Sequence, residues 1–263
     1  MKKIKNQSRR SDKEVLTIYV ILRALVILTM VRSVIMQEWD SFVLCILTLL
    51  LFTIPSFIRK EFRIALPSLL EGTIYCFIFA AEILGEINNF YGRIPFWDTI
   101  LHTLNGFICA GIGFSLVDLL NKNSKRLQLS PVYVAIVGFC FSMTVGVCWE
   151  FIEFSADHLL QTDMQKDTLV SSISSVYINP EKANKAVILN NISETDIHYD
   201  DGKVYQLKGG YLDIGLIDTM SDLFVNLIGA LTFSIYGYFV IRKRDGQKLE
   251  EFVPHRLADD SQD

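Results

Sequence analysis

The stretch FYGRIPFWDTILHTLNG, residues 90–106, places an acid and a histidine one helical turn apart at the start of an apolar segment. Asp98 and His102 are four residues apart, so a helix puts both side chains on one face. The apolar run continues to about Leu120, which is long enough for the ~20 residues that cross a bilayer. The stretch therefore predicts a membrane-spanning helix that carries ionisable side chains at one end.

Five further apolar runs share the length of this one. The chain has 263 residues, of which 51% are hydrophobic, and its mean hydropathy of +0.33 is high for a soluble domain. The expected spans are 15–36, 39–58, 66–85, 97–120, 131–154 and 216–241. We therefore expect an all-α polytopic membrane protein with one six-helix membrane domain, residues 15–241.

Basic residues are concentrated in alternate connections between these spans. The connections that carry them are the N-terminal tail 1–14, the turns after the second and fourth spans, and the C-terminal tail 242–263. Lys and Arg remain on the cytoplasmic side of a membrane. Both termini are therefore expected in the cytoplasm, in a multi-pass protein of the bacterial plasma membrane. The basic N-terminal tail is interpreted as a flank of the first span, and nucleic acid is not an expected partner.

The connection between the fifth and sixth spans, about residues 155–215, is the only long one, and the topology places it outside the membrane. Runs of β-branched residues flank the sequence DDGK, residues 200–203. A short turn of this composition between two such runs is typical of a β-hairpin. A small hairpin-like outer loop is therefore expected between the last two helices.

Three of the predicted helices carry polar stripes at their outer ends. Asp98 and His102 begin the fourth span, Glu150 and Glu153 lie near the end of the fifth, and the sixth holds a stripe with a four-residue spacing, Asp218, Asp222 and Asn226. A carboxylate in hydrocarbon costs about 2.5–3.5 kcal/mol even on a lenient scale. We therefore expect the three stripes to face one another and to share a proton, a cation or a water-filled cavity.

Two roles are open for this cluster in an envelope enzyme, namely general acid–base catalysis and the binding of a divalent metal ion. The candidate catalytic residues are His102, Glu150, Glu153 and Asp222. The candidate metal ligands are His102, Glu150, Asp218 and Asp222, with Asp98 and Asn226 in supporting positions. Asp98 alone could instead serve as a cap for its helix.

Non-enzymatic alternatives also fit the pattern. The stripes could form a structural polar network that ties three helices together, in an envelope accessory factor or a small transporter. A transport pathway would need polar residues on the cytoplasmic side as well, and the inner halves of the last three spans are nearly free of charge. Away from the cluster, Glu71 and Glu82 are expected to form structural pairs with Arg23. The substrate and the oligomeric state are left open.

The ordered series YGRIPFWDTILHTLNG, WEFIEFSAD and DTMSDLFVNLIGA resembles the uncharacterised YjdF-like family of bacterial membrane proteins. More distantly it is similar to VanZ-like proteins, which pair an early Asp-x-x-x-His helix with a late Asp-x-x-x-Asn helix ending in Gly-Ala. The resemblance covers about residues 66–238. It implies a polytopic protein of the bacterial envelope and no established reaction. The matching positions are Asp98, His102, Glu150, Glu153, Asp218, Asp222 and Asn226. A lipid-linked or cell-wall substrate is the hypothesis that joins this location to the polar cluster.

Overall fold

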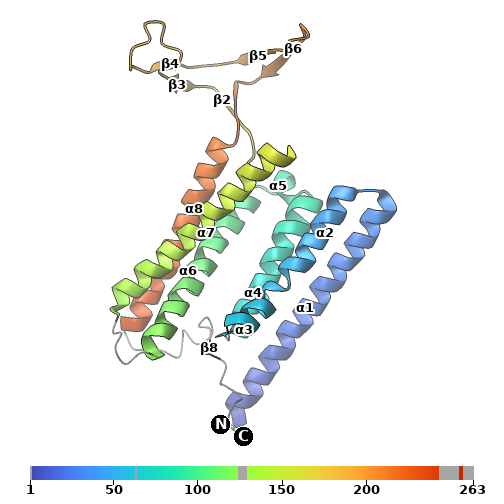
Figure 1. Cartoon of the computed structure of the whole chain (residues 1–263), viewed down its shortest axis with the longest axis vertical. Helices are drawn as coiled ribbons and strands as arrows, with labels where there is room; N and C mark the ends of the chain where they lie inside the picture. Colours follow the sequence, from blue (N-terminus) through green and yellow to red (C-terminus); the bar gives the residue numbers. More distant parts are fainter. Residues whose placement is uncertain (1, 63, 124–128, 243–254, 257–263) are drawn as a thin grey trace. The chain divides into compact units, whose positions relative to one another are not determined.

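Helices dominate the computed structural model, which describes residues 2–62, 64–123, 129–242 and 255–256 (Figure 1). The helices are α1 (Lys2–Met36), α2 (Trp39–Leu51), α3 (Ile54–Phe62), α4 (Ser68–Ile78), the π-helix η1 (Phe79–Ile87), α5 (Phe90–Arg93), α6 (Trp97–Asn123), α7 (Pro131–Leu160) and α8 (Leu216–Arg242). Strand β1 (Ile64–Ala65) pairs antiparallel with β8 (His255–Arg256).

Six helical segments are long and apolar enough to cross a membrane. They are Lys13–Met36, Trp39–Glu61, Ser68–Ile87, Trp97–Asn121, Pro131–Leu160 and Leu216–Arg242. Two of them are composite, since α2 with α3 makes the second and α4 with η1 makes the third. The prediction of an all-α, six-span membrane protein is confirmed.

The fifth span, α7, is longer than the apolar run in its sequence predicted. It continues past Phe154 to Leu160, so the following connection begins at residue 161 and not near 155. The helix continues through the polar residues that follow Phe154. Within it, Ser155 Oγ donates a hydrogen bond to the carbonyl oxygen of Phe151 at 2.6 Å. The helix ends at Gln161, whose φ of 57° is left-handed. Of the predicted C-terminal tail, only Arg242 and β8 belong to the described residues.

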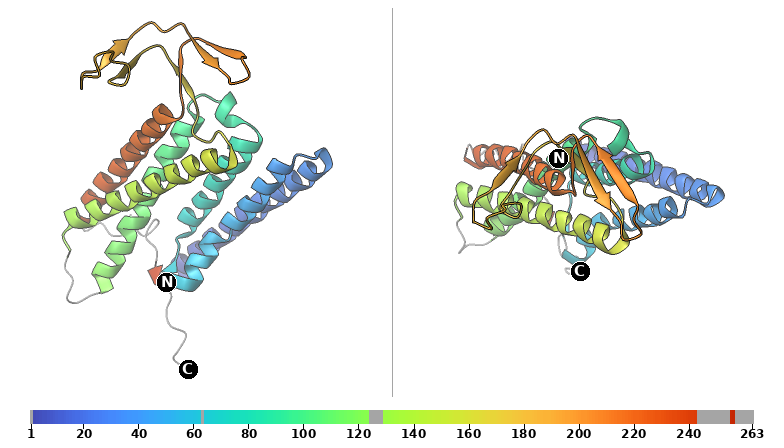
Figure 2. Two further views of the ribbon diagram at one scale, coloured as in Figure 1. Left: turned by 45° about the horizontal axis from the view of Figure 1, so that its top comes forward. Right: turned by 90° about the horizontal axis from the view of Figure 1, so that it is seen from above.

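The chain divides into two compact units, one up to Gly146 and from Phe224 onward, the other from Val147 to Leu223. In the first unit α1 lies along α2 and α4 (Figure 2). The core between them is aromatic: Phe52 and Tyr75 lie 5.5 Å apart between ring centroids, and Tyr19 lies 5.0 Å from Tyr75. A second core in this unit joins α6, α7 and α8 through Ala110, Phe114, Val134 and Phe233.

Glu71 forms its ion pair with Arg59 of α3, at 2.6 Å, and also accepts a hydrogen bond from Tyr75 at 3.0 Å. The prediction that Glu71 pairs with Arg23 is therefore wrong. Arg23 is instead hydrogen-bonded to Tyr19, one turn earlier on its own helix. The physical reason is the return of α3 beside the start of α4, which brings a second arginine within reach of the carboxylate.

The second unit carries three antiparallel strand pairs between α7 and α8 (Figures 1 and 2). They are β2 (Thr168–Val170) with β7 (Tyr211–Asp213), β3 (Ile173–Ser175) with β4 (Val187–Leu189), and β5 (Glu194–His198) with β6 (Val204–Lys208). The β5–β6 pair is the predicted hairpin, and Gly202 takes a φ of 80° in its turn. The other two pairs have strands of three residues, too short for a recognisable alternation.

We expect Phe52→Ala to lower the stability of the first unit by roughly 2 kcal/mol or more. The ring is 1% exposed between Tyr19 and Tyr75, and in a membrane the loss is mainly one of packing contacts. Leu50→Ala on α2 is the control, because that side chain is 60% exposed. Unfolding of the detergent-solubilised protein measures both, and equal midpoints for the two variants would contradict the expectation.

Candidate functional site

The acid–histidine pair lies in the first two turns of α6. The helix starts after Phe96, whose φ is 64° and whose carbonyl oxygen accepts the N–H of Ile100 at 2.9 Å. Asp98 is therefore already inside the helix, and its carboxylate oxygen lies 3.5 Å from His102 Nε2. The side chain of His102 is 10% exposed and that of Asp98 36%. The predicted pairing of these two residues on one helix face is confirmed.

One turn deeper, an amide pair joins α6 to α8. Asn105 Nδ2 donates a hydrogen bond to Asn226 Oδ1 at 3.3 Å, and Cys109 Sγ donates to Asn105 Oδ1 at 3.4 Å. Asn226 is fully buried, and its Nδ2 donates to Met143 Sδ of α7 at 3.6 Å. Asn226 thus contacts both neighbouring helices.

The backbones of α6 and α8 touch directly beside this amide pair. A Cβ added to Gly106 would lie 2.1 Å from the carbonyl oxygen of Asn226, and one added to Gly229 would lie 2.0 Å from that of Thr103. Small residues permit this approach between membrane helices. Ser142 of α7 donates its hydroxyl hydrogen to the carbonyl oxygen of Gly106 at 2.8 Å. The three helices therefore meet at the level of Asn226.

The contacts farther along α6 and α8 define their relative direction. Asn105 faces Asn226, a Cβ on Gly111 would lie 3.0 Å from the ring of Phe233, and one on Gly237 would lie 2.7 Å from the ring of Phe114. Residue numbers rise together along both helices, so the two run parallel in a constant register. Their N-terminal ends, which carry Asp98 and Asp222, therefore point the same way.

The acidic stripe of α7 is buried. Glu150 and Glu153 both belong to the buried polar residues, as does Asp222 of α8. Glu153 Oε1 accepts a hydrogen bond from the indole N–H of Trp149 at 2.7 Å, one turn earlier. The candidate catalytic residues His102, Glu150, Glu153 and Asp222 are therefore all removed from solvent and lipid, as the cost of placing them in hydrocarbon requires.

The acids at the end of α7 and the start of α8 accept hydrogen bonds from the loop that connects these two helices. Asp157 accepts hydrogen bonds from the backbone N–H groups of Met164 at 2.6 Å and Gln165 at 2.8 Å. Asp218 Oδ2 accepts the N–H of Lys166 at 2.7 Å. These partners are backbone groups, which leave no sequence signal. Nearby in this loop, burial raises the pKa of Asp167, and neighbouring aspartates raise it further.

The fold defines a class of protein, a multi-pass helical membrane protein whose last three spans each carry buried polar residues. A family model described as predicted membrane protein (DUF2238) matches residues 16–243. The chain belongs to this family.

An uncharacterised protein of Thermotoga maritima is 34% identical to the chain over 83 residues, which are 32% of this chain and 41% of that protein. The chain thus matches less than half the length of this relative. No solved structure matches the chain.

We expect Gly229→Ala to destabilise the α6–α8 contact strongly, because its Cβ would meet a backbone oxygen that cannot move aside. Gly72→Ala in α4 is the matched control, since its Cβ would meet side-chain atoms no closer than 3.7 Å. A helical alanine is otherwise favoured over glycine by up to ~1 kcal/mol. The midpoint temperature of thermal unfolding in detergent should fall for Gly229→Ala and not for Gly72→Ala. An unchanged midpoint for Gly229→Ala would contradict the close approach of the two helices.

Proposed function

We propose that the chain is an enzyme of the bacterial plasma membrane that binds a divalent metal ion at its buried polar site. Its reaction is hydrolysis or group transfer on a lipid-linked or cell-wall substrate. The proposed ligands are Asp98, His102 and Asp222. The observation that carries the proposal is the close pair on α6, in which a carboxylate oxygen of Asp98 lies 3.5 Å from Nε2 of the buried His102.

The register of α6 and α8 supports the same ligand set. Asn105 faces Asn226, and both helices are unbroken toward their N-terminal ends. One helical turn before this pair, α6 carries His102 and α8 carries Asp222. Asp98 lies one turn before His102 on α6, and the two side chains are paired. The sequence prediction also held Asp218 and Glu150, and the proposed set has Asp98 in their place. Asp218 accepts a backbone N–H of the loop, and Glu150 takes the acid–base role described below.

The chemistry of the donors suits a transition metal. Two carboxylates and one imidazole match the mixed oxygen and nitrogen sites of zinc enzymes and related metalloenzymes, which keep one position open for water or substrate. A bound ion of this kind lowers the pKa of its water toward neutrality and polarises a phosphoryl or carbonyl oxygen. Four acids and one histidine carry an excess of negative charge, which a divalent cation offsets.

The glutamates of α7 supply the remaining acid–base role. We assign Glu150 as the general base that takes a proton from the attacking water and Glu153 as the group that holds its position. The hydrogen bond from Trp149 fixes the Glu153 carboxylate. Asn226 and Asn105 orient the end of α8 relative to α6 without contacting the reacting atoms. Burial of these groups excludes bulk water from the reaction.

Transport is the less favoured function, because a mainly apolar core joins the helices of the first unit beyond Asn226. The core that joins α6, α7 and α8 there consists of Ala110, Phe114, Val134, Ala135, Ala230, Phe233 and Val240. Its aromatic rings pack together, with Phe114 and Phe233 5.8 Å apart between centroids. Buried polar side chains in this half include Ser115, Asp118 and Ser234, and most of the candidate site residues lie in the other half, which favours chemistry at one membrane face over a through-pathway.

We predict that the purified protein retains a divalent metal ion and that His102→Ala and Asp222→Asn each lose it. Each variant removes one of three proposed ligands, so the loss should exceed tenfold in metal content, which elemental mass spectrometry measures. His158→Ala is the control, because this histidine is exposed and its ring lies against Phe154, one turn earlier on its own helix. Metal in the His102→Ala protein at the wild-type level would overturn the proposal.

We also predict that the polar end of the bundle faces outward and that both termini are cytoplasmic, as the basic residues indicate. A cysteine placed at Asp200, in the exposed hairpin turn, should react with an impermeant maleimide in intact cells. A cysteine at Arg242, at the far end of α8, should react only after the membrane is opened. The reverse pattern would place the site on the cytoplasmic face.

A further inference from the structure

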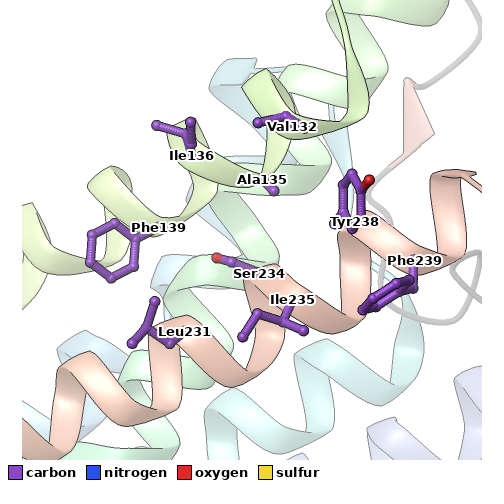
Figure 3. A pocket seen from close by; sticks show the side chains of 9 residues that line it. All are labelled: Val132, Ala135, Ile136, Phe139, Leu231, Ser234, Ile235, Tyr238 and Phe239. Carbon is purple, nitrogen blue, oxygen red and sulfur yellow. The ribbon is translucent and has the colours of Figure 1, made fainter.

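A groove lies between the first half of α7 and the second half of α8, away from the polar end (Figure 3). Its volume is about 450 Å³, within the range of small-molecule sites. It is lined by Val132, Ala135, Ile136, Phe139, Leu231, Ser234, Ile235, Tyr238 and Phe239. Seven of these nine side chains are hydrocarbon, and the helices that carry them are membrane-spanning. The groove therefore suits a hydrocarbon chain.

One buried hydroxyl in the groove has no partner. Ser234 is 6% exposed, and its Oγ makes no hydrogen bond among the described residues. Hydroxyl groups elsewhere in the spans donate to the carbonyl four residues earlier, as Thr232 does to Ile228 at 2.7 Å and Thr144 to Cys140 at 2.9 Å. Ser234 instead points from α8 toward α7 (Figure 3). A buried donor of this kind indicates an acceptor on the occupant of the groove.

A cation lies at the end of the groove. Tyr238 lines it one turn after Ser234, and Arg242 follows one turn later in the last turn of α8. The guanidinium group of Arg242 donates to Tyr238 Oη at 3.2 Å and lies 6.0 Å from the centre of its ring. Ser234 and Arg242 are eight residues apart, about 12 Å along the helix, and the contact with Tyr238 turns the guanidinium group back toward Ser234.

We propose that this groove binds an anionic phospholipid of the adjacent leaflet. One acyl chain lies between α7 and α8, its ester carbonyl accepts the Ser234 hydroxyl hydrogen, and the phosphate pairs with Arg242. In a phospholipid the ester carbonyls and the phosphate belong to one molecule, which supplies both an acceptor for Ser234 and an anion for Arg242. Basic pockets between membrane helices bind lipid headgroups in this way. The site is independent of the proposed metal site.

A helix from a second copy fits the groove less well. The backbone carbonyls of a helix are already hydrogen-bonded within it, so a helix offers Ser234 no strong acceptor. A helix also supplies no anion for Arg242 unless it carries an acid at that depth, which is costly. The ester and phosphate of a lipid supply both groups at the membrane boundary.

Native mass spectrometry of the full-length protein tests the assignment with phosphatidylglycerol and phosphatidylcholine of identical acyl chains. Wild type should bind the first phosphatidylglycerol about fivefold more tightly, the effect of one basic residue. Arg242→Gln should remove this preference. Ser234→Ala should weaken both lipids by about threefold to tenfold, the loss of one hydrogen bond. Arg93→Gln and Thr232→Val are matched controls for charge and hydroxyl loss.

The headgroup preference is a ratio within one preparation, so partial unfolding of a variant does not change it. A preference for phosphatidylglycerol that survives Arg242→Gln would overturn the proposal, and so would unchanged binding of both lipids by Ser234→Ala. Ile235→Trp, which fills the groove, should abolish the tight binding of the first phosphatidylglycerol. If this variant kept the lipid and instead separated a dimer into monomers, the groove would be an interface between two copies.

Discussion

The contact between α6 and α8 at Gly106 and Gly229 sets the conditions for the polar site. Backbone meets backbone there, and this brings the amides of Asn105 and Asn226 within hydrogen-bonding distance. Hydrocarbon offers no water to satisfy a polar group, so each amide needs a partner within the protein. A larger side chain at either glycine would separate the helices, and the polar groups above the contact would lose the register that aligns them.

The last three spans divide into two ends with different chemistry. Acids and one histidine occupy the N-terminal ends of α6 and α8, whereas the core beyond Asn226 is mainly aromatic and aliphatic, with Ser115, Asp118 and Ser234 as buried polar residues. The only strong cation that α8 carries lies at its opposite end, in Arg242. Such a distribution suits a protein that presents a reactive site to one face of the membrane and meets lipid headgroups at the other. It is poorly suited to a pore.

Acids that look equivalent in the sequence have different partners in the structure. Asp218 and Asp222 belong to one stripe, yet Asp218 holds the backbone of the loop at Lys166, while Asp222 is buried. Glu71 likewise pairs with Arg59 and not with Arg23. In both cases a return of the chain supplies a partner that the spacing of residues along a helix does not reveal. The ordering of the loop by acids also explains why α7 continues well beyond its apolar run.

The sequence by itself determined the six spans, the one hairpin with a turn signal and the helix faces on which the polar residues lie, because hydrophobic length and periodicity are local properties. Only the tertiary structure decided which acid meets which partner, where α6 and α8 touch, and that Ser234 lines a groove. Those features depend on backbone approach and side-chain contact between segments distant in sequence. The backbone groups that bind Asp157 and Asp218 have the same identity at every residue, so no sequence pattern could have identified them.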